Sequence, residues 1–256
     1  MIELQDVNEA NPPSKHIFFK VFFTFNLSTK NIPVDFLMAL IILYFMTKIN
    51  SFHKNADFST RLTRSDFLGD AFDVAKKTLL GSYLCTKINN QLTVGKITEI
   101  EVYTGGEDKA SHTYQNKRTS RTEPIFKIGG HTYVFLVYGM YHQFCVVVSE
   151  QDNPCCILIR AVEPILGLET MKKRRKTDNI KQLTNGPAKV CQAFDINRHL
   201  SGLDLLDSPI WICPKSSDIT ENDIVATTRI GVDYAGEYAL KKWRFMLKNT
   251  PFISKK

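Results

Sequence analysis

A carboxylate and an aromatic ring, two residues apart, are the first side chains in this sequence that could carry out a reaction. Glu101 and Tyr103 end the segment 95–103, in which apolar and polar residues alternate as is typical of a strand. Side chains at this spacing project from one face of a strand, together with Ile97 and Glu99. The pair suits a general base that activates water beside a stacked planar substrate. A solvated strand face is the alternative, and Glu99 fits it equally well.

Histidine and aspartate side chains offer a second kind of chemistry, a metal site. His112 stands eleven residues after Glu101, and Asp108, His131 and His142 complete the candidate ligands. Metal sites often place two histidines at a short fixed spacing, and this sequence contains no HxH or HxxxH pair. Its six histidines are scattered along the chain. We therefore expect neither a bound metal nor another cofactor.

Positive side chains and hydroxyl groups gather in the segment 114–122, whose polar composition predicts a loop. Lys117, Arg118 and Arg121 supply the charges, and such a mixture binds phosphate oxygens well. A solvated loop is the alternative. The run KKRRK at 172–176 could also bind phosphate or simply be solvated, and we interpret it as the polar end of a helix.

Three large side chains stand in a short stretch between two apolar strands. Tyr138, Met140 and Tyr141 surround a glycine there, which predicts the tip of a hairpin. Aromatic rings exposed at such a tip, beside basic loops, suit a wedge that enters a stack of bases and kinks a duplex. A corner that closes the core is the alternative.

The composition is that of a cationic globular protein. Of the 256 residues, 43% are apolar and 23% are charged, which excludes wholesale disorder. The formal net charge is +7, from 33 Lys and Arg against 26 Asp and Glu. Residues 1–60 hold five lysines and five acids, so the whole surplus lies in residues 61–256. A cationic globule prefers polyanionic partners, either nucleic acid or an acidic lipid surface.

The positions of the cysteines bear on the redox state of the compartment in which the protein acts. They lie at positions 85, 145, 155, 156, 191 and 213, and none forms a CxxC pair, which does not favour a zinc knuckle. Cys155 and Cys156 are adjacent and precede an apolar run. We expect buried thiols in a reducing compartment rather than a disulfide framework.

The elements that must position these side chains alternate without a regular βαβ rhythm. Strands are predicted at 83–87, 95–103, 131–138, 144–149, 157–162, 210–213 and 229–232. Helices are predicted within 66–84, at 166–175 and within 186–200, the last with Pro187 in its first turn. We therefore expect an α+β fold, a single mixed domain with a curved, mostly antiparallel sheet flanked by helices.

Residues 1–60 form an N-terminal extension that differs from the domain expected at 61–256. Apolar runs lie within 17–46, and the longer one, 36–46, has eleven residues against the roughly 20 that span a bilayer. Acidic residues at the start do not favour a secretory signal. Three interpretations stay open, namely a peripheral membrane anchor, a helix that docks on the domain, and a true start at Met46 with over-read upstream codons. We prefer the last and expect no membrane contact.

Six ordered blocks of the sequence together resemble the alkyladenine (3-methyladenine) DNA glycosylase family, whose members excise alkylated purines. They run from about residue 64 to 254, leave residues 1–45 outside, and are far more specific in this order than any one block. The blocks are EIEVYTGGEDKASH at 99–112, KRTSRTEPIF at 117–126, GHTYVFLVYGMY at 130–141, LIRAVEP at 158–164, GPAKVCQAFDI at 186–196 and RIGVDYAGE at 229–237.

The resemblance implies a site for hydrolysis of an N-glycosidic bond. It assigns Glu101 to deprotonation of the attacking water, and Arg160 to holding that water and a nearby phosphate. It places the extruded base between Tyr103 and Phe135, with His112 hydrogen-bonded to the base edge. No Lys occupies the Glu101 position or its neighbours on the strand face. We therefore expect water as the nucleophile and an abasic site as the product, without a strand nick.

The same resemblance implies contact with double-stranded DNA that carries alkylated or deaminated purines. Tyr138 fills the gap that the extruded nucleotide leaves in the duplex. The other implied DNA contacts, in the groove or at backbone phosphates, are Met140, Tyr141, Thr119, Arg121 and Lys189. We expect a monomer that is not secreted, and that acts in the cytoplasm or nucleoid of a bacterium or in a eukaryotic nucleus.

Two positions depart from the pattern of the family. Phe135 stands where many relatives have Tyr, which keeps the stacking face and loses a hydroxyl group. Cys145 falls, in a gap-free reading from YGMY, where relatives commonly have an Asn that is thought to exclude the exocyclic amine of guanine. A smaller and less polar Cys145 puts this exclusion in doubt. The segment before Arg160 is also two residues longer than in some relatives.

Three other functions compete with this one. A non-catalytic nucleic-acid-binding protein on the same scaffold explains the charge and the aromatic tip, but leaves Glu101 and Arg160 without a purpose. An enzyme that acts on a small nucleoside or a formyl group does not need the cationic loop, and its activity would depend little on salt. A membrane-associated protein would use residues 17–46.

Overall fold

A computed structural model describes residues 57–217 and 219–254. The three interpretations of the N-terminal extension, and the apolar segment 17–46, fall outside these described residues. None of the helices in the described part has the length and apolar character needed to cross a membrane. The boundary predicted at residue 60 stays a prediction.

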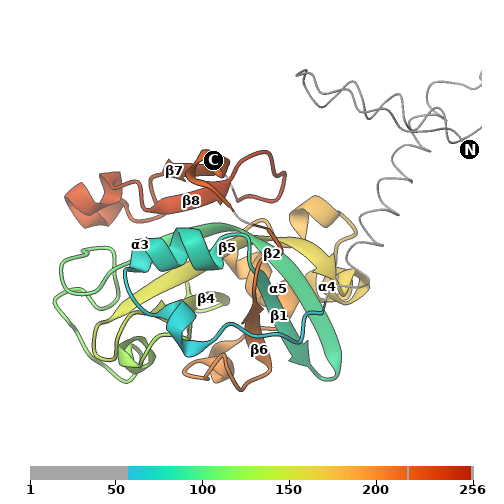
Figure 1. Cartoon of the computed structure of the whole chain (residues 1–256), viewed down its shortest axis with the longest axis horizontal. Coiled ribbons are helices and arrows are strands. Elements are labelled where there is room, and N and C mark those ends of the chain that lie inside the picture. The colour runs from blue at the N-terminus through green and yellow to red at the C-terminus, as the bar shows by residue number, and fades with distance from the viewer. Residues whose placement is uncertain (1–56, 218, 255–256) are drawn as a thin grey trace, which may run out of the picture. The chain divides into compact units, whose positions relative to one another are not determined.

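A sheet of eight antiparallel strands forms the centre of the described domain, and its long strands curve (Figure 1). The strand order is β3–β4–β5–β2–β1–β6, and β8 pairs with both β2 and β7. The predicted α+β fold with an antiparallel sheet is therefore confirmed. The strands are β1 (Tyr83–Ile88), β2 (Gln91–Tyr103), β3 (Thr132–Val137), β4 (Tyr141–Val148), β5 (Cys155–Leu166), β6 (Ile210–Cys213), β7 (Ile224–Thr227) and β8 (Arg244–Leu247).

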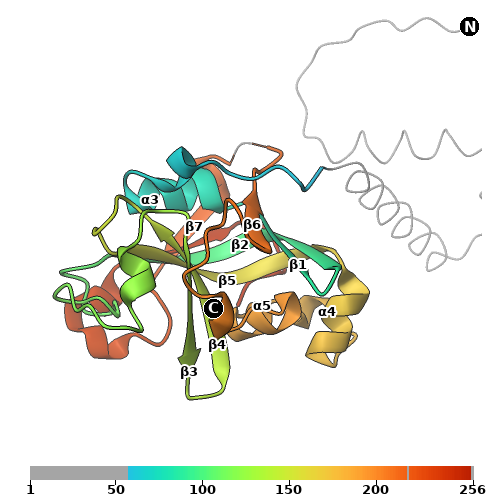
Figure 2. The ribbon, with the colours of Figure 1, turned by 90° about the horizontal axis from the view of Figure 1, so that it is seen from below.

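Short helices flank the sheet (Figure 2). They are α3 (Ala71–Asp73), which continues as π-helical turns over Val74–Leu79, α4 (Leu168–Arg175) and α5 (Pro187–Phe194). Helix α5 packs against β4 and β5, and α4 packs against α5. The helix predicted within 186–200 ends at Phe194 because Asp195 has a left-handed backbone with φ of 59°, which stops the helix.

A bulge in β2 decides which of its residues reach each face of the sheet. The register with β5 shifts between Ile97 and Glu99, and Thr98 has no partner residue on β5. An extra residue reverses the alternation of a strand, and Ile97 accordingly packs in the main core with Ile100. The prediction that Ile97 shares a face with Glu99 and Glu101 is therefore wrong.

The segment 229–232, predicted as a strand, lies in none of the eight described strands. Its polar groups serve another purpose. The Arg229 side chain is buried in an ion pair with Asp108, and the backbone amide of Ile230 donates to the Glu101 carboxylate at 2.8 Å. This amide is therefore not free to join a ladder, and β7 forms before the segment instead.

The main hydrophobic core lies between the sheet and the helices. It joins strand residues such as Ile100 and Ile159 to Val74, Val190 and Phe194 of the helical segments. A smaller cluster on the other face holds Tyr133, Cys145 and Leu158, and Tyr103 and Phe135 pack against it. The six cysteines are buried free thiols, as predicted.

Candidate active site

The strand register lines up side chains from distant parts of the chain on one face of the sheet. Tyr133 on β3 lies opposite Cys145 on β4, which lies opposite Leu158 on β5. Leu158 lies opposite Glu101 on β2, which in turn lies opposite Arg244 on β8. Directly opposed residues of a sheet project from the same face. The ladder therefore brings Glu101 beside side chains that are far away in sequence.

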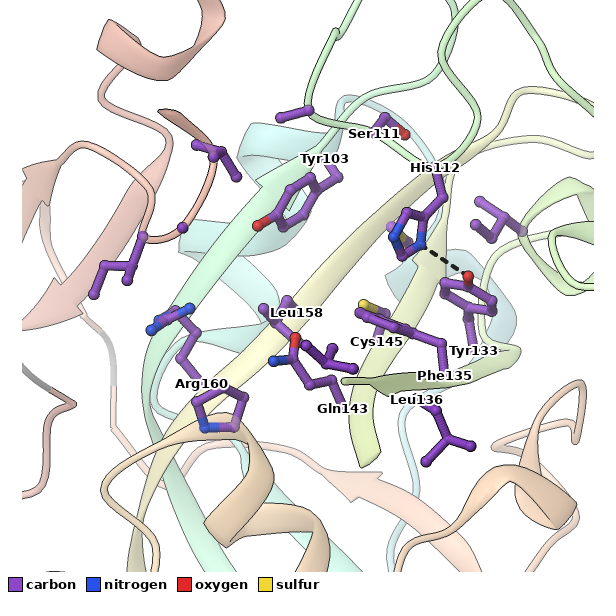
Figure 3. A pocket seen from close by; sticks show the side chains of 18 of the residues that line it. Tyr103, Ser111, His112, Tyr133, Phe135, Leu136, Gln143, Cys145, Leu158 and Arg160 are labelled. Atoms are coloured by element: carbon purple, nitrogen blue, oxygen red, sulfur yellow. Dashed lines mark hydrogen bonds between the residues drawn. The ribbon is translucent and has the colours of Figure 1, made fainter. Parts of the chain in front are cut away.

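This face of the sheet forms a wall of a cavity of about 490 Å³ (Figure 3). Residues 110–112, residues 230–232 and Tyr234 form other parts of its lining. A cavity of this size accommodates a small planar molecule. The predicted site residues that line it are Tyr103, His112, Arg121, Phe135, Tyr138, Cys145 and Arg160. Those outside its lining are Glu101, Thr119, Met140, Tyr141 and Lys189.

Glu101 lies just behind the cavity wall and accepts three hydrogen bonds. Its Oε2 accepts from the Tyr103 hydroxyl at 2.8 Å and from Nη1 of Arg160 at 3.1 Å. Its Oε1 accepts from the backbone amide of Ile230 at 2.8 Å. These three donors belong to residues that line the cavity, whereas Glu101 itself is fully buried. The alternative of a solvated strand face is therefore wrong for Glu101, and also for the buried Glu99.

A second buried carboxylate, that of Glu99, holds Arg160 from the other side. Glu99 Oε1 accepts from Nε of Arg160 at 3.1 Å, Nη1 of Arg244 at 3.2 Å and the Ser254 hydroxyl at 2.7 Å. Two carboxylates and two guanidinium groups thus balance each other away from solvent, as buried charges must. Arg160 bridges both carboxylates, which fixes the direction of its guanidinium plane.

The aromatic rings of Tyr103 and Phe135 lie on different walls, with Leu158 between them (Figure 3). Burial raises the pKa of Tyr103 well above its ordinary value, and the charge of Glu101 adds to this effect. The Tyr103 hydroxyl therefore keeps its proton and donates a hydrogen bond to the carboxylate of Glu101. Phe135 stacks on Tyr133 with ring centroids 5.1 Å apart and an angle of 22° between the planes.

His112 is neutral and is already hydrogen-bonded on both ring nitrogens. Burial, with the charge of Arg121, lowers its pKa to about 4. Nη2 of Arg121 lies 3.3 Å from Nε2, and the Tyr133 hydroxyl lies 2.9 Å from Nδ1. A guanidinium group only donates, so Nε2 accepts and the imidazole proton resides on Nδ1. His112 can therefore form a hydrogen bond with a ligand only if Tyr133 or Arg121 moves away from its ring nitrogen.

The other histidines weighed as metal ligands lie elsewhere. His131 is hydrogen-bonded through Nδ1 to the Ile128 carbonyl at 2.8 Å, and Asp108 is paired with Arg229. No group of three or more His, Cys, Asp or Glu residues in the described parts of the chain could hold a metal ion.

Cys145 is buried in the wall of the cavity, where the sequence predicts a residue that faces the base. Burial raises its pKa well above the ordinary thiol value, and a hydrogen bond and charge from Cys156 add to this. The thiol therefore stays protonated and behaves as a small, weakly polar side chain.

The hairpin between β3 and β4 carries exposed side chains at its tip. Tyr138 is 86% exposed, Met140 66% and Tyr141 51%, so the alternative of a corner that closes the core is wrong. Tyr138 also has a φ of 52°, in the left-handed region that a bulky side chain rarely adopts. Strain of this kind gathers at functional sites, and here it holds an aromatic ring away from the protein.

The cations of the loop 114–122 divide into two kinds. Arg118 is occupied by Glu123 and Asp152, with which it forms ion pairs at 2.6 and 2.8 Å. Arg121 lines the cavity, and its guanidinium carbon lies 5.7 Å from the centroid of the Phe135 ring. Arg121, unlike Arg118, therefore faces the space where a ligand would bind.

The remaining predicted phosphate contacts lie outside the cavity. The Thr119 hydroxyl joins a local turn with Thr122. Lys189 lies in the first turns of α5, where Nζ donates to the Asn185 side chain at 2.7 Å. Burial, with the charge of Arg175, lowers the pKa of Lys189. The run at 172–176 forms the end of α4, as predicted.

Several residues of the site carried no clear signal in the sequence. Arg229 binds Asp108 through two hydrogen bonds of 2.6 and 2.8 Å and lies 4.6 Å from the centroid of the Tyr103 ring. Ser254 and Gln143 are further examples. Only the folded chain shows that Ser254 donates to Glu99 and that Gln143 lines the cavity. The resemblance block at 229–237 marked the segment but not these contacts.

Comparisons with known proteins identify the family of the chain. The family model described as methylpurine-DNA glycosylase matches residues 65–251. A protein of Natranaerobius thermophilus is 44% identical over 190 residues, which cover 73% of this chain and 96% of that protein. One of Clostridium novyi is 40% identical over 204 residues, 77% of this chain and 99% of that protein. A protein of Bacillus cytotoxicus is 44% identical over 197 residues, which cover 73% of this chain and 96% of that protein.

All three relatives bear the name "Putative 3-methyladenine DNA glycosylase". The region matched by the family model contains every predicted site residue, from Glu101 to Lys189. The chain therefore belongs to the methylpurine-DNA glycosylase family.

Proposed function

We propose that this protein is a monofunctional DNA glycosylase that flips alkylated or deaminated purines out of duplex DNA and hydrolyses their N-glycosidic bond. As a member of its family the chain is a DNA glycosylase, which supports the reaction class. The observation that carries the finer proposal is a buried carboxylate, Glu101, joined to an aromatic cavity by Tyr103 and Arg160. In this proposal the protein leaves an abasic site for the later steps of base excision repair.

Glu101 acts as the general base in this proposal. Its carboxylate takes a proton from water, the water oxygen bonds to C1′ of the deoxyribose, and the bond from C1′ to the purine breaks. The electron pair of that bond leaves with the base. An alkylated purine that carries a positive charge becomes neutral as it leaves, whereas a neutral deaminated purine leaves as an anion and takes a proton from water. Arg160 holds the water and an adjacent phosphate.

Water must first reach Oε2 of Glu101, which the Tyr103 hydroxyl and Arg160 cover in this structure. Arg160 is held by Glu99 as well, whereas Tyr103 has its ring at the cavity. We propose that the entering base moves Tyr103, and that water takes the place of its hydroxyl. The position for water is therefore created by the substrate.

The base stacks between Tyr103 and Phe135, and His112 hydrogen-bonds its edge after exchanging a present partner. A purine with a positive charge stacks well on such rings. Cys145 faces the base where relatives commonly have the amide of an Asn. Exclusion of the guanine amine at this position is therefore weaker than with Asn. None of the residues that line the cavity in the described structure is a lysine, which supports water rather than an amine as the nucleophile.

DNA binds at the face that carries the exposed tip. Tyr138 fills the gap left by the flipped nucleotide, while Met140 and Tyr141 lie beside it in the groove. Thr119, Arg121 and Lys189 contact backbone phosphates. One copy of the chain provides all these groups, so we propose a monomer that acts wherever the cell keeps its DNA.

The test of this function is release of free base from duplexes that each carry one alkylated or deaminated purine. We expect free base in solution and strand breaks that appear only after treatment with alkali, because the product is an abasic site. A protein that binds these duplexes but releases no base from any of them is a binding protein. Breaks that form without alkali would contradict the monofunctional mechanism.

Tyr138→Asn is expected to weaken binding to a lesion-bearing duplex about tenfold to a hundredfold, while binding to undamaged DNA changes little. The lost stacking of an aromatic side chain on bases is worth about 1–3 kcal/mol. Asparagine tolerates the left-handed backbone, so the hairpin keeps its shape. Binding titrations of both duplexes measure the effect. Leu240→Asn, at another exposed apolar residue, is the control. Equal losses on both duplexes would exclude Tyr138 as the wedge.

A further inference from the structure

One half-buried amide side chain in the cavity has no partner within the described structure. Gln143 lines the cavity from β4 and is half-buried, and its amide forms no hydrogen bond with any described residue. Figure 3 shows this amide between the ring of Phe135 and the guanidinium group of Arg160. An amide has two donors and an acceptor, so it is costly to leave unsatisfied when a ligand excludes water.

Most of the other polar groups inside the cavity are already occupied. The Tyr103 hydroxyl donates to Glu101, and both nitrogens of His112 have partners. Arg160 is divided between two carboxylates, and the buried Cys145 is a small, weakly polar thiol next to Cys156. Among the described side chains that line the interior, Gln143 is thus the one whose full hydrogen-bonding capacity is open to a ligand.

The strand register fixes where Gln143 meets a bound base. Gln143 lies opposite Phe135 on β3, so its amide stands beside the ring that would stack on the base. It precedes Cys145 by two residues on the same face, which places it about 7 Å nearer the hairpin tip. In the proposed function the water and an adjacent phosphate lie at Arg160, which stands next to Gln143 in the cavity, so the sugar lies on this side (Figure 3). Gln143 therefore faces the part of the base nearest the glycosidic bond.

The chemistry of purines identifies the groups that an amide can bind there. Two edges flank the glycosidic nitrogen. One begins with C8, which carries only hydrogen on carbon, and the other begins with N3, which accepts a hydrogen bond. In guanine the neighbouring carbon also bears the N2 amine, a donor. An amide can donate to N3 and accept from N2 at the same time. In 3-methyladenine the methyl group occupies N3 and there is no N2 amine.

We propose that Gln143 is a specificity-determining residue, whose amide binds N3 and the N2 amine of an extruded guanine-type base and thereby admits alkylated guanines to the cavity. This inference rests on the proposed function. The wall at Cys145 offers a small thiol, which leaves room for the amine, and Gln143 supplies its hydrogen-bonding partner two residues away. Alkylated adenines are released without help from Gln143.

The experiment compares two bases released from one substrate. DNA treated with a methylating agent contains both 7-methylguanine and 3-methyladenine, and chromatography separates the released bases under single-turnover conditions. Gln143→Met keeps the length of the side chain and removes its hydrogen bonds. We expect release of 7-methylguanine to fall about tenfold or more, while that of 3-methyladenine stays within about threefold. Gln143→Leu repeats the test if the first variant does not fold.

Each outcome decides the matter. Gln151→Met, at an exposed loop residue, is the matched control and leaves both rates unchanged. An equal loss of both bases, or no loss of either, would overturn the role of Gln143. Release of 3-methyladenine but not 7-methylguanine by the unaltered protein would also overturn it, and the proposed function would stand. Release of neither base would overturn the proposed function itself.

Discussion

Glu101→Gln should bind a lesion-bearing duplex and release its base about a thousandfold more slowly than the unaltered protein. General base catalysis contributes about 10²–10⁴-fold to a rate, and an amide cannot take the proton of the attacking water. The amide oxygen can still accept from Arg160 and Tyr103. Loss of activity with retained binding would thus separate the chemical step from recognition.

Single-turnover release of free base and a binding titration with the same duplex measure these two effects. Glu163→Gln is the matched control, because Glu163 lies farther along β5 and does not line the cavity. Thermal unfolding of both variants shows whether the buried site has kept its structure. Turnover at the normal rate by Glu101→Gln would remove Glu101 from the role of base and require another group to activate water.

The strands could be predicted because their pattern is local. Alternation around Glu101 and the apolar stretch before Tyr138 mark strands and a hairpin. The residues of the tip left open whether it is exposed or closes the core, and only the structure shows that it is exposed. The position of Ile97 could not be predicted, since it depends on a bulge that appears only when β2 pairs with β5. The segment at 229–232 was predicted as a strand because nothing in its own residues shows that Ile230 donates to a distant carboxylate.

The residues of the candidate site could be predicted, but the hydrogen bonds and ion pairs between them could not. Tyr103, Phe135 and Cys145 line one cavity, in agreement with what the resemblance implies. The burial of Glu101 depends on the pairing of β2 with β8 and on the amide of Ile230, which lie more than a hundred residues away. A strand pattern gives no information about such partners, which is why a solvated face fitted the sequence equally well.

Asp108→Asn should lower the free energy of unfolding by about 3–5 kcal/mol, the usual effect of removing one partner of a buried ion pair. Neither side chain of the pair with Arg229 is exposed, and both carboxylate oxygens accept from its guanidinium group. Burial alone would lower the pKa of Arg229, and the hydrogen bonds and charge of Asp108 outweigh this and raise it. Without that carboxylate, a positive charge stays buried against Tyr103.

Denaturant unfolding of the variant, at constant protein concentration, measures this loss. Lys109→Met is the matched control at the next residue, where the ion pair with Glu237 is largely exposed, and we expect a far smaller change. The double variant Asp108→Leu with Arg229→Met removes both charges and should recover part of the stability, because no uncompensated charge remains. Equal destabilisation by Asp108→Asn and Lys109→Met would show that water reaches the pair. The support that it gives to Tyr103, on the wall of the cavity, would then be much weaker than its geometry indicates.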